Sequence, residues 1–150
     1  MRQLVESIKE NGVLTPIAVR EKEGGRYELI SGHRRRRACE LAGIASLPAV
    51  VLPLDDDGAV IAMVDANLQR EHILPSEKAF AYKMKLDAMK RQGRRSDLTS
   101  SQLGMKLQGK QALDTMGSEI GESRNQIHRY IRLTYLISPL LTLVDRKSVV

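Results

Sequence analysis

The sequence contains no tryptophan, one phenylalanine and four tyrosines, so it offers few rings on which single-stranded bases could stack. Its single cysteine, Cys39, excludes an internal disulfide. No apolar run approaches the ~20 residues of a membrane span, and no signal-peptide pattern is present. These absences predict a soluble cytoplasmic protein, for which duplex DNA is a better partner than a single strand.

Basic residues outnumber acidic ones. Twenty-four lysines and arginines against eighteen aspartates and glutamates give a formal net charge of +6, and the pI is near 9.7. Such a chain attracts polyanions through long-range forces and counterion release. Nucleic acid is therefore the first partner to expect, and 150 residues suffice for one core or for two small ones.

An arginine tract follows an expected strand and begins an expected helix, with the sequence SGHRRRRA from Ser31 to Ala38. A helix start offers unpaired N–H groups and the positive end of the helix dipole, and guanidinium groups add charged donors. This combination favours an anionic ligand such as phosphate. A helix with a merely arginine-rich solvated face is the alternative for a charge run taken alone.

Apolar spacing predicts the elements around this tract. We expect a helix over 1–11, a hairpin near 17–30, the helix of the arginine tract with Ala38, Leu41 and Ala42 inward, a short strand in 47–52, and a helix ending near 68. Together they make an α+β lobe at residues 1–74. Pro75 then favours the first turn of a longer helix over Ser76 to Arg91, and glycines and polar residues predict a mobile or weakly helical connector over 92–111.

Residues 112–150 are predicted to form an all-α, DNA-binding lobe with a helix-turn-helix at 112–133. Gly121 suits the turn, and Ser123 and Gln126 stand at capping-box spacing. Arginine can bind guanine and asparagine or glutamine can bind adenine in the major groove, whereas an arginine near the helix end suits a phosphate. A plain helical hairpin is the alternative. The candidate DNA-binding residues are Ser123, Arg124, Asn125, Gln126, His128, Arg129 and Arg132.

Three segments together resemble the ParB family of plasmid and chromosome partition proteins. They are TPIAVR at 15–20, GHRRRRA at 32–38 and NLQRE at 67–71, in the family's order and with the helix-turn-helix after them. Residues 125–133 are similar to ParB-like proteins of mobile elements in Gram-positive bacteria. The resemblance implies an α+β fold in which a small lobe shared with sulfiredoxin precedes an all-α helix-turn-helix lobe.

The resemblance also implies a centromere-like DNA site, CTP with magnesium in the first lobe, and a homodimer that closes as a clamp. A ParA-type ATPase would bind a segment not present here, and no C-terminal dimerisation domain is expected in this chain. Asn67 would help to hold magnesium through the nucleotide. The implied nucleotide-binding residues are Thr15, Pro16, Ile17, Arg20, Gly32, His33, Arg34, Arg35, Asn67, Arg70 and Glu71.

Two departures from the family pattern concern hydrolysis. His33 stands where the family's tract usually has glutamate, and Ala66 precedes Asn67 where a glutamate is usual. Carboxylates position magnesium or polarise an attacking water, so their absence weakens hydrolysis more than phosphate binding. We therefore expect no confident catalytic residue, and either nucleotide binding without efficient turnover or loss of nucleotide use.

Other functions fit parts of the sequence. Sulfiredoxin chemistry is disfavoured because Gly32 occupies its cysteine position and Cys39 is expected to be a buried thiol. A ParB-fold nuclease is disfavoured because His33, His72 and His128 are scattered and lack paired carboxylates at metal-site spacing. A transcriptional regulator or nucleoid-type adaptor without nucleotide use remains open.

Overall fold

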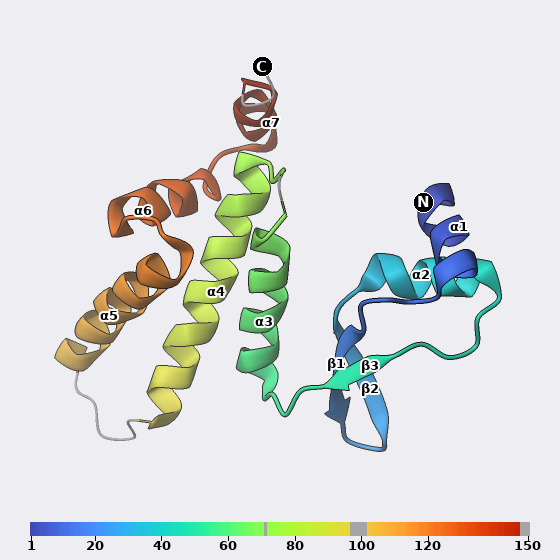
Figure 1. The fold of residues 1–150 in the computed structure, drawn as a ribbon. Coiled ribbons are helices and arrows are strands. Elements are labelled where there is room, and N and C mark those ends of the chain that lie inside the picture. The colour runs from blue at the N-terminus through green and yellow to red at the C-terminus, as the bar shows by residue number, and fades with distance from the viewer. Residues whose placement is uncertain (71, 97–101, 148–150) are drawn as a thin grey trace. The chain divides into compact units, whose positions relative to one another are not determined.

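The computed structural model describes residues 1–70, 72–96 and 102–147, and it divides into two compact units, Met1–Ala59 and Val60–Val150 (Figure 1). The division falls near the start of helix α3 (Asp56–Leu68). The first unit mixes helices with a three-stranded sheet and the second is helical, so the expected α+β class is confirmed. Among the described residues, no helix is long and apolar enough to cross a membrane.

The first unit contains α1 (Arg2–Asn11), β1 (Ile17–Lys22), β2 (Arg26–Ser31), α2 (His33–Ala42) and β3 (Ala49–Val51). The sheet order is β2-β1-β3, with β1 antiparallel to β2 and parallel to β3. The predicted hairpin and third strand are thus present. β1 is the central strand, and its residues Ile17 and Val19 are buried.

Helix α2 packs on α1 through a small apolar cluster. Ile8, Ala38 and Cys39 are buried there, so Cys39 is the buried thiol expected from the sequence. Leu41, which the apolar spacing placed inward, is 51% exposed. The buried residues of α2 are Ala38, as expected, and Cys39, and both pack with Ile8 of α1.

The second unit is built around α4 (Pro75–Ser96), which packs against α5 (Gln102–Ile120), α6 (Arg124–Leu133) and α7 (Ser138–Lys147). Its core residues are Tyr82, Leu86, Leu113, Met116, Ile127 and Ile131. α4 extends to Ser96 and α5 begins at Gln102, so the segment between helices is shorter than the connector expected over 92–111. Packing of Leu113 and Met116 on α4 stabilises α5 despite its glycines, because tertiary contacts outweigh helix propensity.

Candidate functional site

Gly32 makes the turn from β2 into α2. It has φ 100° and ψ 20°, a left-handed conformation that glycine adopts readily. A Cβ atom at this position would lie 2.6 Å from Cγ2 of Ile17, so the turn also needs the absence of a side chain. Gly32 therefore places the first turn of α2 directly against the start of β1.

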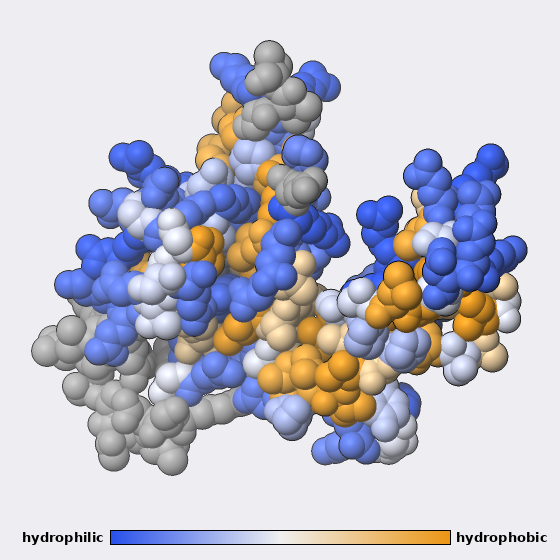
Figure 2. Space-filling view, viewed as in Figure 1, coloured by the Kyte–Doolittle hydropathy of each residue, from blue (hydrophilic) through white to orange (hydrophobic). Residues whose placement is uncertain are grey.

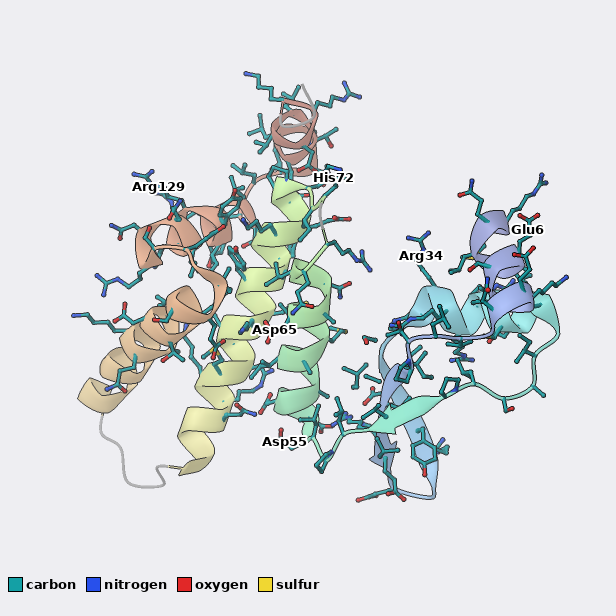
Figure 3. All side chains as sticks on the ribbon, in the orientation of Figure 1. Glu6, Arg34, Asp55, Asp65, His72 and Arg129 are labelled. Atoms are coloured by element: carbon teal, nitrogen blue, oxygen red, sulfur yellow. The ribbon has the colours of Figure 1, made fainter. Side chains whose placement is uncertain are left out.

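The amino end of α2 has the features of an anion site. The first helical hydrogen bond within α2 runs from the Arg36 N–H to the Gly32 carbonyl at 3.0 Å, which leaves the amides of His33, Arg34 and Arg35 at the open end. Within the described residues no side chain caps this end, and its first turn contains no acidic residue. His33 and Arg34 are exposed, and Figure 3 shows Arg34 projecting from the helix. An anion bound here would meet both amides and a guanidinium.

Arg35 orders the neighbouring loop. Its Nη1 atom donates to the carbonyl oxygens of Thr15 and Pro16, at 2.6 and 2.5 Å. The loop and the start of α2 are therefore held together, with Ile17 buried beneath Gly32. The structure thus brings together five of the residues predicted to bind nucleotide, namely Thr15, Pro16, Ile17, Gly32 and Arg35.

The next two arginines of the tract are engaged along the helix. Arg36 and Arg37 donate to Glu40 at 3.1 and 3.0 Å. The hydrogen bond from Arg37, with the charge of Arg36, holds the pKa of Glu40 below its usual value. Arg34 is therefore the arginine of the tract for which the described residues show no ion pair or hydrogen bond.

Arg20, which is also predicted to bind nucleotide, is buried and already paired with carboxylates in this structure. It is only 6% exposed, and its guanidinium donates to Glu28 at 2.5 Å and to Asp56 at 2.6 Å. Hydrogen bonds from Arg20 and then Lys22 lower the pKa of Asp56. This cluster joins β1, β2 and the start of α3 and balances the charge of Arg20.

Asn67 and Arg70 belong to the second unit. Both line a groove of about 330 Å³, together with apolar residues of α3 and α4 such as Met63, Phe80 and Met84. The Asn67 amide nitrogen donates to the Met63 carbonyl at 2.9 Å, which leaves its amide oxygen as the atom able to meet a metal. Glu71 lies outside the described residues. Across the described part of the chain, no group of three or more His, Cys, Asp or Glu residues is arranged to hold a metal ion.

Helices α5 and α6 form the predicted helix-turn-helix. Gly121 makes the turn with φ 76°. The Ser123 hydroxyl accepts a hydrogen bond from the Gln126 N–H at 3.3 Å, and the Gln126 side chain accepts one from the Ser123 N–H at 3.0 Å. The capping box predicted from the sequence is confirmed, and its two side chains are occupied in holding the start of α6.

The two faces of α6 differ sharply. Ile127 and Ile131 are buried, whereas the other face presents polar side chains and is largely hydrophilic in Figure 2. Arg129 points outward from the helix in Figure 3. Arg124 lies 3.6 Å from Asp114 of α5, a loose contact between two exposed side chains. The exposed residues on α6 are Arg124, Asn125, Gln126, His128, Arg129 and Arg132.

Three residues that shape this helix-turn-helix were not predicted from the sequence. A Cβ atom at Gly117 would lie 2.7 Å from the Glu122 carbonyl oxygen, so Gly117 allows the turn to approach α5. Lys78 of α4 forms an ion pair with Glu122. The spacing of Gly117 four residues before Gly121 was the one local signal for this close approach.

Comparison with known proteins shows which family this chain resembles. Residues 1–68 match the family model described as the ParB N-terminal domain. A probable chromosome-partitioning protein ParB from Neisseria meningitidis is 34% identical over 140 residues, which are 93% of this chain and 42% of that protein. The chain therefore spans less than half the length of this relative.

Two solved structures of C-terminally truncated ParB from Caulobacter crescentus are similar. The one complexed to the centromeric parS site aligns over 95% of this chain and 65% of the other, with 24% identity and a TM-score of 0.56, which shows a shared fold. The one complexed with CTP-gamma-S aligns over 94% and 68%, with 27% identity and a TM-score of 0.42.

Proposed function

Since this chain belongs to the ParB-like family, we propose that it binds a specific site in double-stranded DNA and acts in the partition of a chromosome, a plasmid or another mobile element. The observation that carries the proposal is the exposed polar face of α6. That face belongs to a helix whose start is capped and whose other face is buried in the core. A helix held in this way can present side chains to the major groove at a fixed angle.

The residues of α6 divide by the contacts that they can make. Arg124, Asn125, His128 and Arg129 are exposed near the beginning and middle of the helix, where side chains reach base edges in helix-turn-helix proteins. Arg132 lies in the last turn and is better suited to a phosphate. Ser123 and Gln126 act chiefly by holding the cap.

Selection from duplexes with a randomised central segment tests this function. The chain should enrich a defined sequence, and an inverted repeat would indicate that two copies bind each site. Arg129→Ala should then weaken binding to the selected duplex by about 1 to 3 kcal/mol and relax the preference at one position. Fluorescence anisotropy at fixed salt measures both dissociation constants.

Arg26→Ala is the matched control. It removes the same charge from an exposed position in the first unit, so it should change affinity only slightly and equally for all sequences. Failure of the wild-type chain to enrich any sequence would contradict the proposed function. Equal losses in the two variants would show that Arg129 contributes only charge.

We further propose that the first unit binds a nucleoside triphosphate, with CTP as the ligand that the family resemblance implies. The open amino end of α2, with exposed Arg34 beside it, fits a triphosphate. Arg35 holds the adjoining loop at Thr15 and Pro16. The resemblance also implies magnesium, for which the amide oxygen of Asn67, in the second unit, is a ligand of suitable chemistry. His33 and Ala66 supply no carboxylate, so binding without efficient hydrolysis is the expected behaviour.

Calorimetric titration with each of the four ribonucleoside triphosphates, with and without magnesium, tests this second proposal. Arg34→Ala should weaken CTP binding about tenfold or more, because a charge-assisted contact to phosphate is lost. Arg37→Ala removes an arginine one turn further along α2 that already pairs with Glu40, and it should retain most of the affinity. Absence of heat with all four nucleotides would contradict the proposal without affecting the DNA selection.

A further inference from the structure

A partly buried ion pair lies at the turn of the helix-turn-helix. Nζ of Lys78, in the first turn of α4, donates to Oε1 of Glu122, which lies in the turn between α5 and α6. The two side chains are 25% and 18% exposed. The pair therefore links the central helix of the second unit to the segment that sets the start of α6.

Two tyrosine rings lie beside the Lys78 ammonium of this pair. Nζ of Lys78 lies 5.6 Å from the ring centroid of Tyr82 in α4 and 4.8 Å from that of Tyr130 in α6. The rings themselves meet edge to face, with centroids 5.7 Å apart at 88°. Cation–π attraction strengthens when the cation is partly desolvated. Lys78 thus contacts the turn and α6 at the same time.

The arrangement is costly for stability alone. Tyr82 is fully buried, and its hydroxyl and Oε2 of Glu122 have no hydrogen-bond partner within the described structure. Burial, and then the negative charge of Glu122, raise the pKa of Tyr82. Well-packed apolar side chains often stabilise such a position more than an ion pair does. The polar groups are therefore better explained by a requirement for geometry than by a requirement for stability.

The turn has little freedom of its own. The N–H groups of Gly121 and Glu122 both donate to the Gly117 carbonyl, at 2.9 and 3.1 Å. A small change in how Glu122 is held would therefore pass directly into the start of α6, which is capped at the next residue, Ser123.

We propose that Lys78 and Glu122 are positioning residues for DNA sequence discrimination, since their ion pair between Tyr82 and Tyr130 fixes the angle at which α6 enters the groove. Neither residue needs to touch a base. The inference rests on the proposed DNA binding by α6. It predicts that loss of the pair reduces the preference for the correct sequence more than it reduces binding to DNA in general.

Glu122→Gln tests the inference because it keeps the shape of the side chain and removes its charge. Dissociation constants are measured for the duplex selected by the wild type and for a scrambled duplex of the same composition, at a temperature where circular dichroism shows each variant folded. The dissociation constant of the scrambled duplex divided by that of the selected duplex should fall about fivefold to tenfold, while the scrambled duplex is bound as before. Lys78→Met should lower the ratio similarly, whereas Lys78→Arg, which keeps the charge, should retain most of the discrimination.

Glu119→Gln is the matched control. It removes a carboxylate in the last turn of α5 that pairs at 2.7 Å with Lys85 and, among the described contacts, not with Lys78 or Glu122. This variant should lose stability and keep its discrimination ratio. An unchanged ratio in folded Glu122→Gln would overturn the inference and leave the pair a purely structural one. If the wild type itself does not distinguish the two duplexes, the proposed function fails first, so the two failures are separable.

Discussion

At the scale of single residues, the close neighbours of Gly117 predict the effect of adding a side chain there. A Cβ atom there would lie 2.7 Å from a backbone oxygen, that of Glu122, and 3.7 Å from Cδ1 of Ile127. The oxygen belongs to the tight turn and has little room to move. Gly117→Ala should therefore lower the free energy of unfolding by about 1 to 3 kcal/mol, as overpacking does in well-packed cores. Urea denaturation followed by circular dichroism measures it.

Gly93→Ala provides the control for this substitution. Gly93 also lies within a helix, α4, but a Cβ atom there would have nothing within 4 Å among the described residues. Alanine is the better helix former, so this variant should gain about 0.5 to 1 kcal/mol. Equal changes in the two variants would show that the close approach at Gly117 does not limit stability.

At the scale of elements, local patterns were predictable and long-range partners were not. The capping box at Ser123 and Gln126 and the inward face of α6 follow from spacing within a few residues, and both are confirmed. The extent of α5 depends on packing against α4, which the sequence of α5 alone does not reveal. In α2, the burial of Cys39 and the exposure of Leu41 depend on which face of the helix meets α1, and the sequence of α2 alone does not reveal that face.

The residues of the candidate sites also divide into those that a local motif predicts and those that depend on long-range contacts. The glycine before α2 and the exposed arginine after it belong to one short motif, so the sequence was sufficient to predict them. Arg20 meets its carboxylates on another strand and at the start of α3, and Arg35 bonds to a loop before β1. Lys78 and Glu122 are separated by 44 positions. No short-range sequence pattern reveals such pairs, because the partners meet only when the chain has folded.

At the scale of the whole molecule, the two units should respond to opposite ends of the pH range. In the first unit, hydrogen bonds from Arg20 to Asp56 and from Arg37 to Glu40 lower the pKa of each carboxyl group. Such groups stabilise the fold above their unfolded pKa values, and this contribution is lost as the pH falls through the folded values. The first unit should therefore weaken below about pH 4.

In the second unit the shifts have the opposite sign. Burial opposes the charge of Lys85, but hydrogen bonds to Asp65 and Glu119, at 2.6 and 2.7 Å, raise its pKa overall. Burial also raises the pKa of Tyr82. A group whose pKa is raised by folding contributes stability that is fully present below its unfolded pKa. This stability is lost as the pH rises through its folded pKa. The second unit should therefore weaken above about pH 10.

Since the sequence contains no tryptophan, each unit can receive its own fluorescent probe. Tyr27 and Tyr135 are exposed in the first and second units, so Tyr27→Trp and Tyr135→Trp should leave the fold intact. Urea midpoints measured across the pH range should fall in acid for the first probe and in alkali for the second. Asp56→Asn should flatten the acid limb of the first, whereas Glu10→Gln, at an exposed carboxylate without an ion pair among the described residues, should not. Coincident pH profiles from the two probes would show that the units unfold as one, and would contradict the assignment of each limb to its own ion pairs.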